Sequence, residues 1–243
     1  MPTKYVLVFD ICSSTLFIDD LHQNGKVDNY TLLTVAINKF LSFKIEKYRF
    51  QKYKFLGDGY ILLFEGDTRI DDILFFVLEL TFSTEYVIDW FINNFIESKN
   101  IPRKGITLGI DKGEIFLANS NDSNQEEYIG RPINIACRLQ SSLTEKDHAN
   151  KLLMSFKLYN EIENYLLKKA CIERERVLKN IRENKSLRCY EFNPEFFREF
   201  DIEIIRNPTE KLRKIIEEER SELKLFQRLN QEIKKERVKY IKD

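Results

Sequence analysis

The chain has 243 residues, of which 43% are hydrophobic and 13% aromatic, enough for one large domain with a substantial core. Lysine plus arginine equals aspartate plus glutamate at 39 each, so the net charge does not indicate a nucleic-acid partner. Four cysteines without metal-ligand spacing and no signal peptide favour reduced thiols and a cytoplasmic location. Residues 73–82 are the most apolar stretch, but they are too few to cross a bilayer, so no membrane insertion is expected.

The first half of the chain alternates between strand and helix patterns. Short apolar runs with β-branched and aromatic residues indicate strands, and apolar positions three and four apart indicate helices. We expect strands over residues 5–9, 50–55 and 60–64, and helices over residues 27–47 and 71–96. Gly57-Asp58-Gly59 is typical of a hairpin turn between the second and third strands.

The second half continues the alternation. We expect a strand pair over residues 106–110 and 114–118 around Lys112-Gly113, a short helix over 133–143 after Pro132, a strand over 152–155, a helix to about residue 169, and strands over 171–178 and 187–192. The order β-α-β-β-α-β with additions predicts a ferredoxin-like α+β core. We assign residues 1–193 to this domain.

Residues 194–243 form a different kind of segment. After Pro208 there is no glycine or proline, and an apolar stripe runs among Glu, Lys and Arg. This pattern predicts a long amphipathic helix of about 50 Å. Because acids and bases are mixed along it, packing on its own domain or on a partner protomer is favoured over a membrane surface.

Two aspartates stand where apolar strands meet turns. Asp10 follows the apolar run of residues 5–9, and Asp58 lies in the hairpin turn. A carboxylate in such a place is poorly solvated unless a cation meets it, and two carboxylates side by side would repel each other. A divalent metal is therefore the natural partner. The alternative is a pair of ordinary turn aspartates.

Asn134 and Arg138 are four residues apart on the predicted short helix. Residues with this spacing share one helix face, so both side chains can reach one ligand. An amide and a guanidinium together can hold a ribose oxygen and a phosphoryl oxygen. The alternative is an ordinary polar face of a surface helix.

Four segments together resemble the catalytic domain of class III nucleotidyl cyclases, over roughly residues 4–192. They occur in the order Phe9-Asp-Ile-Cys-Ser-Ser-Thr15, Phe55-Leu-Gly-Asp-Gly59, Gly105-Ile-Thr-Leu-Gly-Ile110 and Gly130-Arg-Pro-Ile-Asn-Ile-Ala-Cys-Arg-Leu139. Each segment is weakly specific alone, but four in this order are strongly specific. The fold of that family agrees with the ferredoxin-like prediction.

The resemblance implies a reaction in which a nucleoside triphosphate becomes a 3′,5′-cyclic nucleotide and pyrophosphate. By similarity, Asp10, Asp58 and the Ile11 carbonyl would bind two Mg²⁺ or Mn²⁺ ions, the arrangement for in-line displacement. Asn134 would position the ribose, and Arg138 would neutralise charge on the α-phosphoryl group.

The resemblance also implies where the triphosphate binds. The expected phosphate-binding groups are the backbone N–H groups of Cys12, Ser13, Ser14 and Thr15, and the side chain of Lys179. Lys179 departs from the family pattern because Asn180 replaces the glycine that usually follows it.

Catalytic domains of this family pair head to tail, and each site takes residues from both chains. The resemblance therefore implies a homodimer with two equivalent shared sites. One protomer would supply Asp10 and Asp58, and the other would supply Asn134 and Arg138.

The base is the least determined part of the substrate. Lys54 and Glu127 occupy the two base-reading positions of adenylate cyclases, although Glu127 replaces an aspartate. The chain also resembles the pyrimidine cyclases of Pycsar antiphage systems, which make cyclic UMP or cyclic CMP for a separate effector. Aromatic residues near Asp58, among them Phe50, Tyr48 and Tyr53, could frame a smaller base or could be ordinary strand residues.

UTP or CTP is the favoured substrate in this interpretation, with ATP as the alternative. A catalytically silent cyclase-like domain for dimerisation or binding is a further alternative, disfavoured because both aspartates and the Asn134/Arg138 pair are present. A diguanylate-cyclase relative is disfavoured because the hairpin reads Leu-Gly-Asp-Gly.

Overall fold

A computed structural model describes residues 1–118, 127–144, 148–178, 186–198, 200 and 217–218. Within these residues, nine strands form a seven-stranded sheet and a separate two-stranded one. The strands are β1 (Thr3–Ile11), β2 (Phe50–Phe55), β3 (Gly59–Glu65), β4 (Ile106–Glu114), β5 (Phe116–Ala118), β6 (Glu127–Ile129), β7 (Lys151–Ser155), β8 (Cys171–Val177) and β9 (Ser186–Phe192). The helices are α1 (Ser14–Gln23), η1 (Val27–Asn29), α2 (Tyr30–Tyr48), α3 (Ile70–Phe95), α4 (Arg131–Ser141), α5 (Phe156–Glu161), α6 (Tyr165–Lys169) and η4 (Pro194–Phe197).

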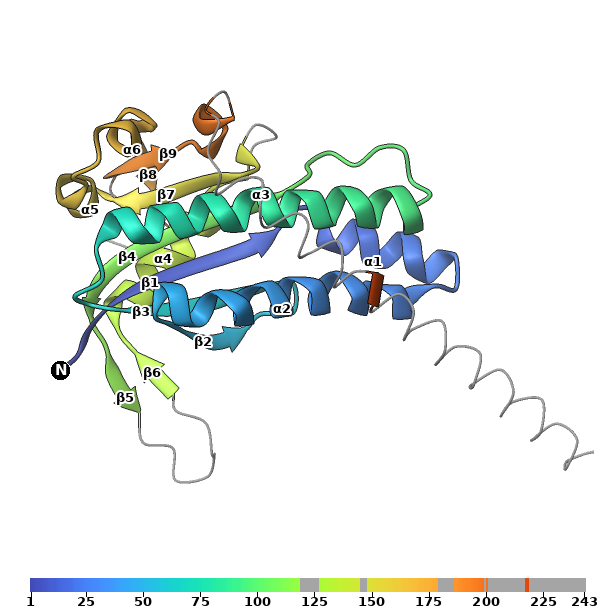
Figure 1. Ribbon diagram of the computed structural model, residues 1–243, viewed down its shortest axis with the longest axis horizontal. Coiled ribbons are helices and arrows are strands. Elements are labelled where there is room, and N and C mark those ends of the chain that lie inside the picture. The colour runs from blue at the N-terminus through green and yellow to red at the C-terminus, as the bar shows by residue number, and fades with distance from the viewer. Residues whose placement is uncertain (119–126, 145–147, 179–185, 199, 201–216, 219–243) are drawn as a thin grey trace, which may run out of the picture.

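The large sheet has the strand order β2-β3-β1-β4-β7-β9-β8 (Figure 1). Its first four strands are all antiparallel, with β1 between β3 and β4. With α1 and α2 before β2, and α3 between β3 and β4, this is the predicted ferredoxin-like β-α-β-β-α-β core, which is confirmed. Strand β7 then joins β4 in parallel, and β9 and β8 extend the sheet.

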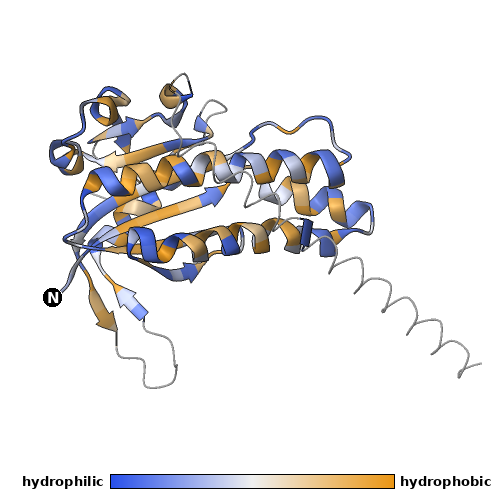
Figure 2. Ribbon diagram, viewed as in Figure 1, coloured by the Kyte–Doolittle hydropathy of each residue, from blue (hydrophilic) through white to orange (hydrophobic). Residues whose placement is uncertain are grey.

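The sheet is covered by helices on both faces. Helices α2 and α3 lie on one face, and α4 lies on the other (Figure 1). Because side chains alternate along a strand, Leu7 and Phe9 of β1 join the large core under α2 and α3, whereas Val6 and Val8 face α4. Burial on both faces explains why β1 is an almost continuous apolar run (Figure 2).

A buried carboxylate fixes α2 against α3. The Glu79 side chain of α3 is 2% exposed, and its carboxylate oxygens lie 2.5 Å from Lys44 Nζ and 2.6 Å from Lys47 Nζ. The Tyr48 hydroxyl donates to the same carboxylate at 2.8 Å. Tyr48 is thereby committed to the packing of the two helices and is not available to a base.

Two element predictions were wrong, one at β4 and one after β7. Strand β4 runs on to Glu114 with no turn at Lys112-Gly113, because both residues stay paired with β1. Strand β5 therefore pairs with β6, which was not predicted, and the two project from the sheet as the β5–β6 arm (Figure 1).

The helix expected to reach residue 169 is instead two short helices, α5 and α6. Asn164 caps α6 by accepting from the amides of Leu166 and Leu167. Asp71 at the start of α3 accepts from the amides of Glu163 and Asn164. These contacts stabilise the break between the helices.

Packing onto the core continues past residue 193. Phe197 of η4 is 2% exposed in the large core, and Arg198 pairs with Glu85 of α3. The predicted long helix after residue 208 and the predicted Lys179 site lie outside the described residues, apart from helical residues 217 and 218. Within the described part of the chain, no helix has the length and apolar character needed to cross a membrane.

Candidate functional site

The fold brings Asp10 and Asp58 together. Asp10 is in register with Gly59, the first residue of β3, so the hairpin turn lies beside the end of β1. The Ile11 amide donates to the Asp58 carbonyl at 3.2 Å. The two carboxyl groups are close enough for a hydrogen bond when one of them is protonated, and both side chains are half-buried.

The two glycines around Asp58 make this approach possible. Gly57 has φ of +100°, a conformation that residues with a Cβ rarely adopt. At Gly59 a Cβ would lie 2.0 Å from the Phe9 carbonyl oxygen. The sequence Gly-Asp-Gly is therefore required for Asp58 to lie against β1.

The paired carboxylates form an acidic site that needs a cation. Burial, followed by the hydrogen bond and charge of Asp58, raises the pKa of Asp10 from 3.8 to about 7. The Arg103 guanidinium acts in the opposite direction but does not offset these effects. At neutral pH the metal-free pair is consequently held partly protonated.

The donor set fits a hard divalent cation. The described residues include no cluster of three or more His, Cys, Asp and Glu, so the site offers two carboxylates and nearby backbone carbonyls such as that of Ile11. Mg²⁺ is commonly bound by one or two carboxylates, with waters and substrate phosphates completing its shell. The fold holds the two carboxylates close together although their charges disfavour each other, which suits them to share a bound cation.

The start of α1 lies next to the carboxylates. The Ser14 hydroxyl donates to Asp58, and Ser13 adopts a left-handed conformation with φ of 61° while its hydroxyl donates to the Arg103 carbonyl. The Cys12 amide already donates to the Gly105 carbonyl at 2.9 Å, so it is not available to a phosphate. The amides of Ser13, Ser14 and Thr15 are at the end of the helix that favours anions.

Helix α4 packs unusually close to β4. A Cβ at Gly109 would lie 2.2 Å from the Ala136 carbonyl oxygen, and the Gln140 side chain donates to Thr107 at 2.8 Å. Thr107 is in register with Asp10. The close contact therefore fixes α4 on the sheet face that carries Asp10.

Asn134 and Arg138 lie on the exposed side of α4. Ile135, Ala136 and Leu139 form its buried side. Among the described residues, neither Asn134 nor Arg138 has a hydrogen bond or ion pair with Asp10 or Asp58. One chain therefore brings the two aspartates together but leaves the other predicted pair facing outward.

A β-bulge determines where Lys54 points. Lys52 pairs with Leu62 and Lys54 pairs with Ile61, so Tyr53 is an extra residue in β2. Lys52 consequently faces α2, where it donates to Asn38 and Ser42. Lys54 shares the sheet face of Ile61 and, by alternation along β1, of Asp10, and it is exposed.

The remaining base candidates have different environments. The Tyr53 hydroxyl accepts from the Tyr128 amide at 2.8 Å and donates to its carbonyl at 3.1 Å, which fixes β6 beside β2. Glu127, the residue before Tyr128, is exposed. Phe50 is 4% exposed and packs on Phe64 and Phe76, so its assignment to base recognition is corrected to a core residue.

Two residues near the carboxylates were not identified from the sequence. The positive charge of Arg103 lowers the pKa of Asp10. Burial, together with the charges of Asp58 and Asp10, raises the pKa of Tyr30. The Tyr30 hydroxyl is buried without a hydrogen-bond partner among the described residues. Neither residue belongs to a recognisable motif, because Arg103 lies in an irregular connection and Tyr30 at the start of a helix.

No protein-family model matches the sequence, and no curated protein matches it. Solved structures do match. The guanylyl cyclase Cya2 has 15% sequence identity and a TM-score of 0.60, over 79% of this chain and 94% of that one. The adenylyl cyclase CyaB from P. aeruginosa has 20% identity and a TM-score of 0.55, over 79% and 93%.

The guanylate cyclase domain of RhGC from Catenaria anguillulae, solved in complex with GTP, has 18% identity and a TM-score of 0.52, over 79% of this chain and 96% of that one. These similarities cover nearly the whole length of each solved domain. The chain has the class III nucleotide cyclase fold.

Proposed function

We propose that this protein is a nucleotidyl cyclase that converts a nucleoside triphosphate into a 3′,5′-cyclic nucleotide and pyrophosphate. The observation that carries the proposal is the pairing of Asp10 and Asp58 at the end of β1. The pair lies on a fold shared with adenylyl and guanylyl cyclases, beside the first turn of α1. A silent binding domain would have no need of two carboxylates that disfavour each other's charge.

Each residue of the site has a role in this reaction. Asp10 and Asp58, with the Ile11 carbonyl, would hold two Mg²⁺ or Mn²⁺ ions, which lower the pKa of the attacking 3′-hydroxyl and stabilise the leaving pyrophosphate. The free amides at the start of α1 bind phosphate oxygens. Arg138 stabilises charge that develops on the α-phosphoryl group, and Asn134 orients the ribose.

The active unit in this proposal is a homodimer with shared sites. Asn134 and Arg138 face away from their own chain's core, so a second chain can present them to Asp10 and Asp58. The β5–β6 arm supports association, because Leu117 and Ile129 are 51% and 61% exposed on a projecting hairpin. A C2 arrangement would create two equivalent sites.

For the base, we propose UTP or CTP, and for the product a role as second messenger to a separate effector in antiphage defence. The support is the resemblance of residues 55–64 and 130–134 to pyrimidine cyclases of that class. The burial of Tyr48 and Phe50 removes two aromatic candidates for stacking. ATP is the second candidate, favoured by the exposed Lys54 on the sheet face of Asp10.

The proposal is tested by incubating the purified chain with each of ATP, GTP, CTP and UTP plus Mn²⁺ and identifying products by mass. A cyclic nucleotide from UTP or CTP is the expected result, and Asp58→Asn should remove it. Product from ATP alone would assign the second candidate. If none of the four gave a cyclic product, the domain would be a binding module.

A further inference from the structure

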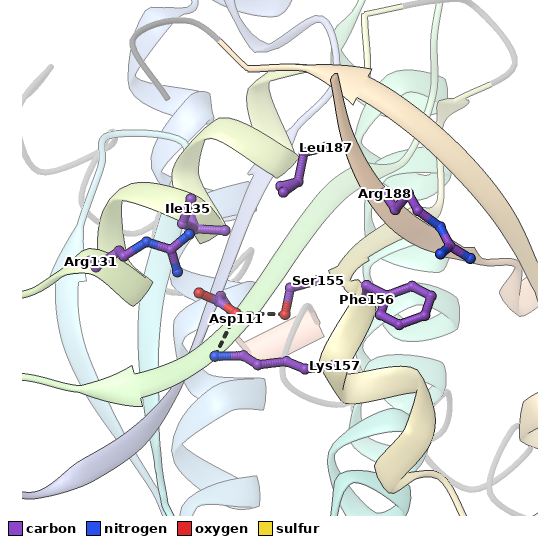
Figure 3. Close-up of a pocket in the computed structure, with 8 residues that line it drawn as sticks. All are labelled: Asp111, Arg131, Ile135, Ser155, Phe156, Lys157, Leu187 and Arg188. Atoms are coloured by element: carbon purple, nitrogen blue, oxygen red, sulfur yellow. Dashed lines mark hydrogen bonds and ion pairs between the residues drawn. The ribbon is translucent and has the colours of Figure 1, made fainter. Parts of the chain in front are cut away.

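A pocket lies at the other end of β4 from the paired aspartates. It has a volume of about 220 Å³ and is bounded by α4, β4, β9 and the start of α5 (Figure 3). Its lining residues are Asp111, Arg131, Ile135, Ser155, Phe156, Lys157, Leu187 and Arg188. Asp111 is in register with Val6, whereas Thr107, next to the proposed active site, is in register with Asp10.

Asp111 has one satisfied and one unsatisfied carboxylate oxygen. The residue is 1% exposed. Its Oδ1 accepts from the Ser155 hydroxyl at 2.6 Å and lies 3.3 Å from Lys157 Nζ. Its Oδ2 is buried without a hydrogen-bond partner and points away from Ser155 and Lys157 (Figure 3). A buried carboxylate oxygen without a donor is costly, so it favours a ligand with an N–H or O–H group.

Of the three cationic side chains that line the pocket, Arg188 and Lys157 form ion pairs with carboxylates. Arg188 pairs with Glu173 at 2.7 Å and stacks over Phe156 at 4.3 Å. Lys157 pairs with Asp111. Arg131, at the start of α4, is exposed and has no ion pair or hydrogen bond within the described part of the chain. Its guanidinium lies at the Asp111 side of the pocket and is ready to accept an anionic group (Figure 3).

The charges and lining select one class of ligand. A simple cation would meet three cationic side chains, and a simple anion would leave the Asp111 Oδ2 unsatisfied. Ile135, Phe156 and Leu187 add an apolar wall. We propose that this pocket binds a small zwitterion with an apolar group, the chemistry of an apolar α-amino acid. Its ammonium donates to Asp111 Oδ2, its carboxylate pairs with Arg131, and its side chain contacts the apolar wall.

The size of the pocket agrees with this class. A volume of about 220 Å³ is below the roughly 300 Å³ at which pockets for drug-sized ligands begin. A ligand in this pocket would contact α4, β4 and α5 together, because Arg131 and Ile135 belong to α4, Asp111 to β4 and Phe156 to α5. Helix α4 also carries Asn134 and Arg138. Binding at this pocket does not depend on the proposed reaction.

The experiment is calorimetric titration of the purified chain, without nucleotide, with L-leucine. Three relatives of leucine isolate the three contacts: leucinamide lacks the carboxylate, 4-methylpentanoate lacks the amine, and glycine lacks the apolar group. We expect leucine to bind and each relative to bind at least about tenfold more weakly. Equal binding of 4-methylpentanoate and leucine, or no binding of leucine at millimolar concentration, would overturn the proposal.

Two variants identify the site. Arg131→Gln changes an exposed residue and should weaken leucine about tenfold or more, whereas the control Lys104→Gln should leave it unchanged. Asp111→Asn keeps an acceptor for Ser155 but presents an N–H to the pocket, so 4-methylpentanoate should then bind better than leucine. Undiminished leucine binding by Arg131→Gln contradicts the assignment even if Asp111→Asn does not fold.

Discussion

The Asp10 carboxyl group, at the end of β1, lies close enough to that of Asp58 in the β2–β3 hairpin to form a hydrogen bond with it when one of the two is protonated. A hydrogen bond between two carboxyl groups requires one of them to carry a proton. The pair therefore stores a proton in the absence of metal, and releases it when a cation takes its place. Stability and metal affinity become linked through the same two side chains.

This linkage gives a pH dependence of stability. Burial and Asp58 raise the pKa of Asp10 from 3.8 to about 7, so between these values the folded state binds more protons than the unfolded state. The free energy of unfolding of the metal-free protein should therefore fall as pH rises from 5 to 8, by about 1–2 kcal/mol after allowance for solvent screening. Chemical denaturation in EDTA at several pH values measures this.

The matched variant is Asp10→Asn, which removes the titrating group and retains its shape. It should be more stable than the wild type at pH 8 in EDTA and lack this contribution to the pH dependence. Mn²⁺ at pH 8 should stabilise the wild type but not the variant. The same pH profile in both proteins would show that Asp10 is not the titrating group.

A mixing experiment tests the shared sites. Asp58→Ala and Arg138→Ala should each lower turnover at least about 100-fold. If each site takes residues from both chains, an equimolar mixture should recover about a quarter of the wild-type activity, because half of the dimers then contain one intact site of two. Turnover with the preferred triphosphate is measured before and after mixing. A mixture as inactive as its components would contradict shared sites.

The contact of α4 with β4 predicts unequal effects of two similar substitutions. Gly109→Ala places a Cβ 2.2 Å from the Ala136 carbonyl and should cost about 2 kcal/mol or more of stability, with loss of activity because α4 moves. Gly113→Ala is the control, since its Cβ would lie 3.5 Å from Pro132, an ordinary contact. Urea denaturation of the two variants gives the comparison, and equal stabilities would show that α4 does not need the close approach.

Base selection is tested on two neighbouring lysines. Lys54→Ala should change the ratio of kcat/KM values among the four triphosphates by about tenfold, because Lys54 shares a sheet face with Asp10. Lys52→Ala should leave the ratio unchanged, because Lys52 bonds Asn38 and Ser42 of α2. A shift caused by Lys52→Ala alone would place the base on the other side of the strand.

Local patterns predicted the order of the core elements well, because β1 and β3 are nearly continuous apolar runs and α2 and α3 carry apolar residues three and four positions apart. The error at residues 112–113 arose from reading Lys112-Gly113 as a turn. Gly113 instead continues β4 opposite Lys4, and at Gly109 of the same strand a Cβ would meet the Ala136 carbonyl oxygen. A glycine in a sequence does not distinguish a turn from a close approach between elements.

The candidate site was predictable only where residues belong to motifs. Asp10 and Asp58 were paired correctly because each ends a strand pattern, and the sheet order then joins them. Phe50 was assigned wrongly because an aromatic residue near Asp58 in sequence can face either side of β2. Because Tyr53 is an extra residue, simple alternation along β2 predicts the wrong face for the residues that follow it, and no local sequence pattern indicates the bulge.

That extra residue has an evolutionary consequence. Deleting Tyr53 would leave Lys52 opposite Leu62 and Lys54 opposite Ile61, so both lysines would keep their present faces of the sheet. The deletion would instead remove the hydroxyl that bonds the Tyr128 backbone and holds β6 beside β2. In this fold, the loss of one residue from β2 is a route to a β5–β6 arm with a new position, while the carboxylate pair and the lysine on its sheet face stay in place.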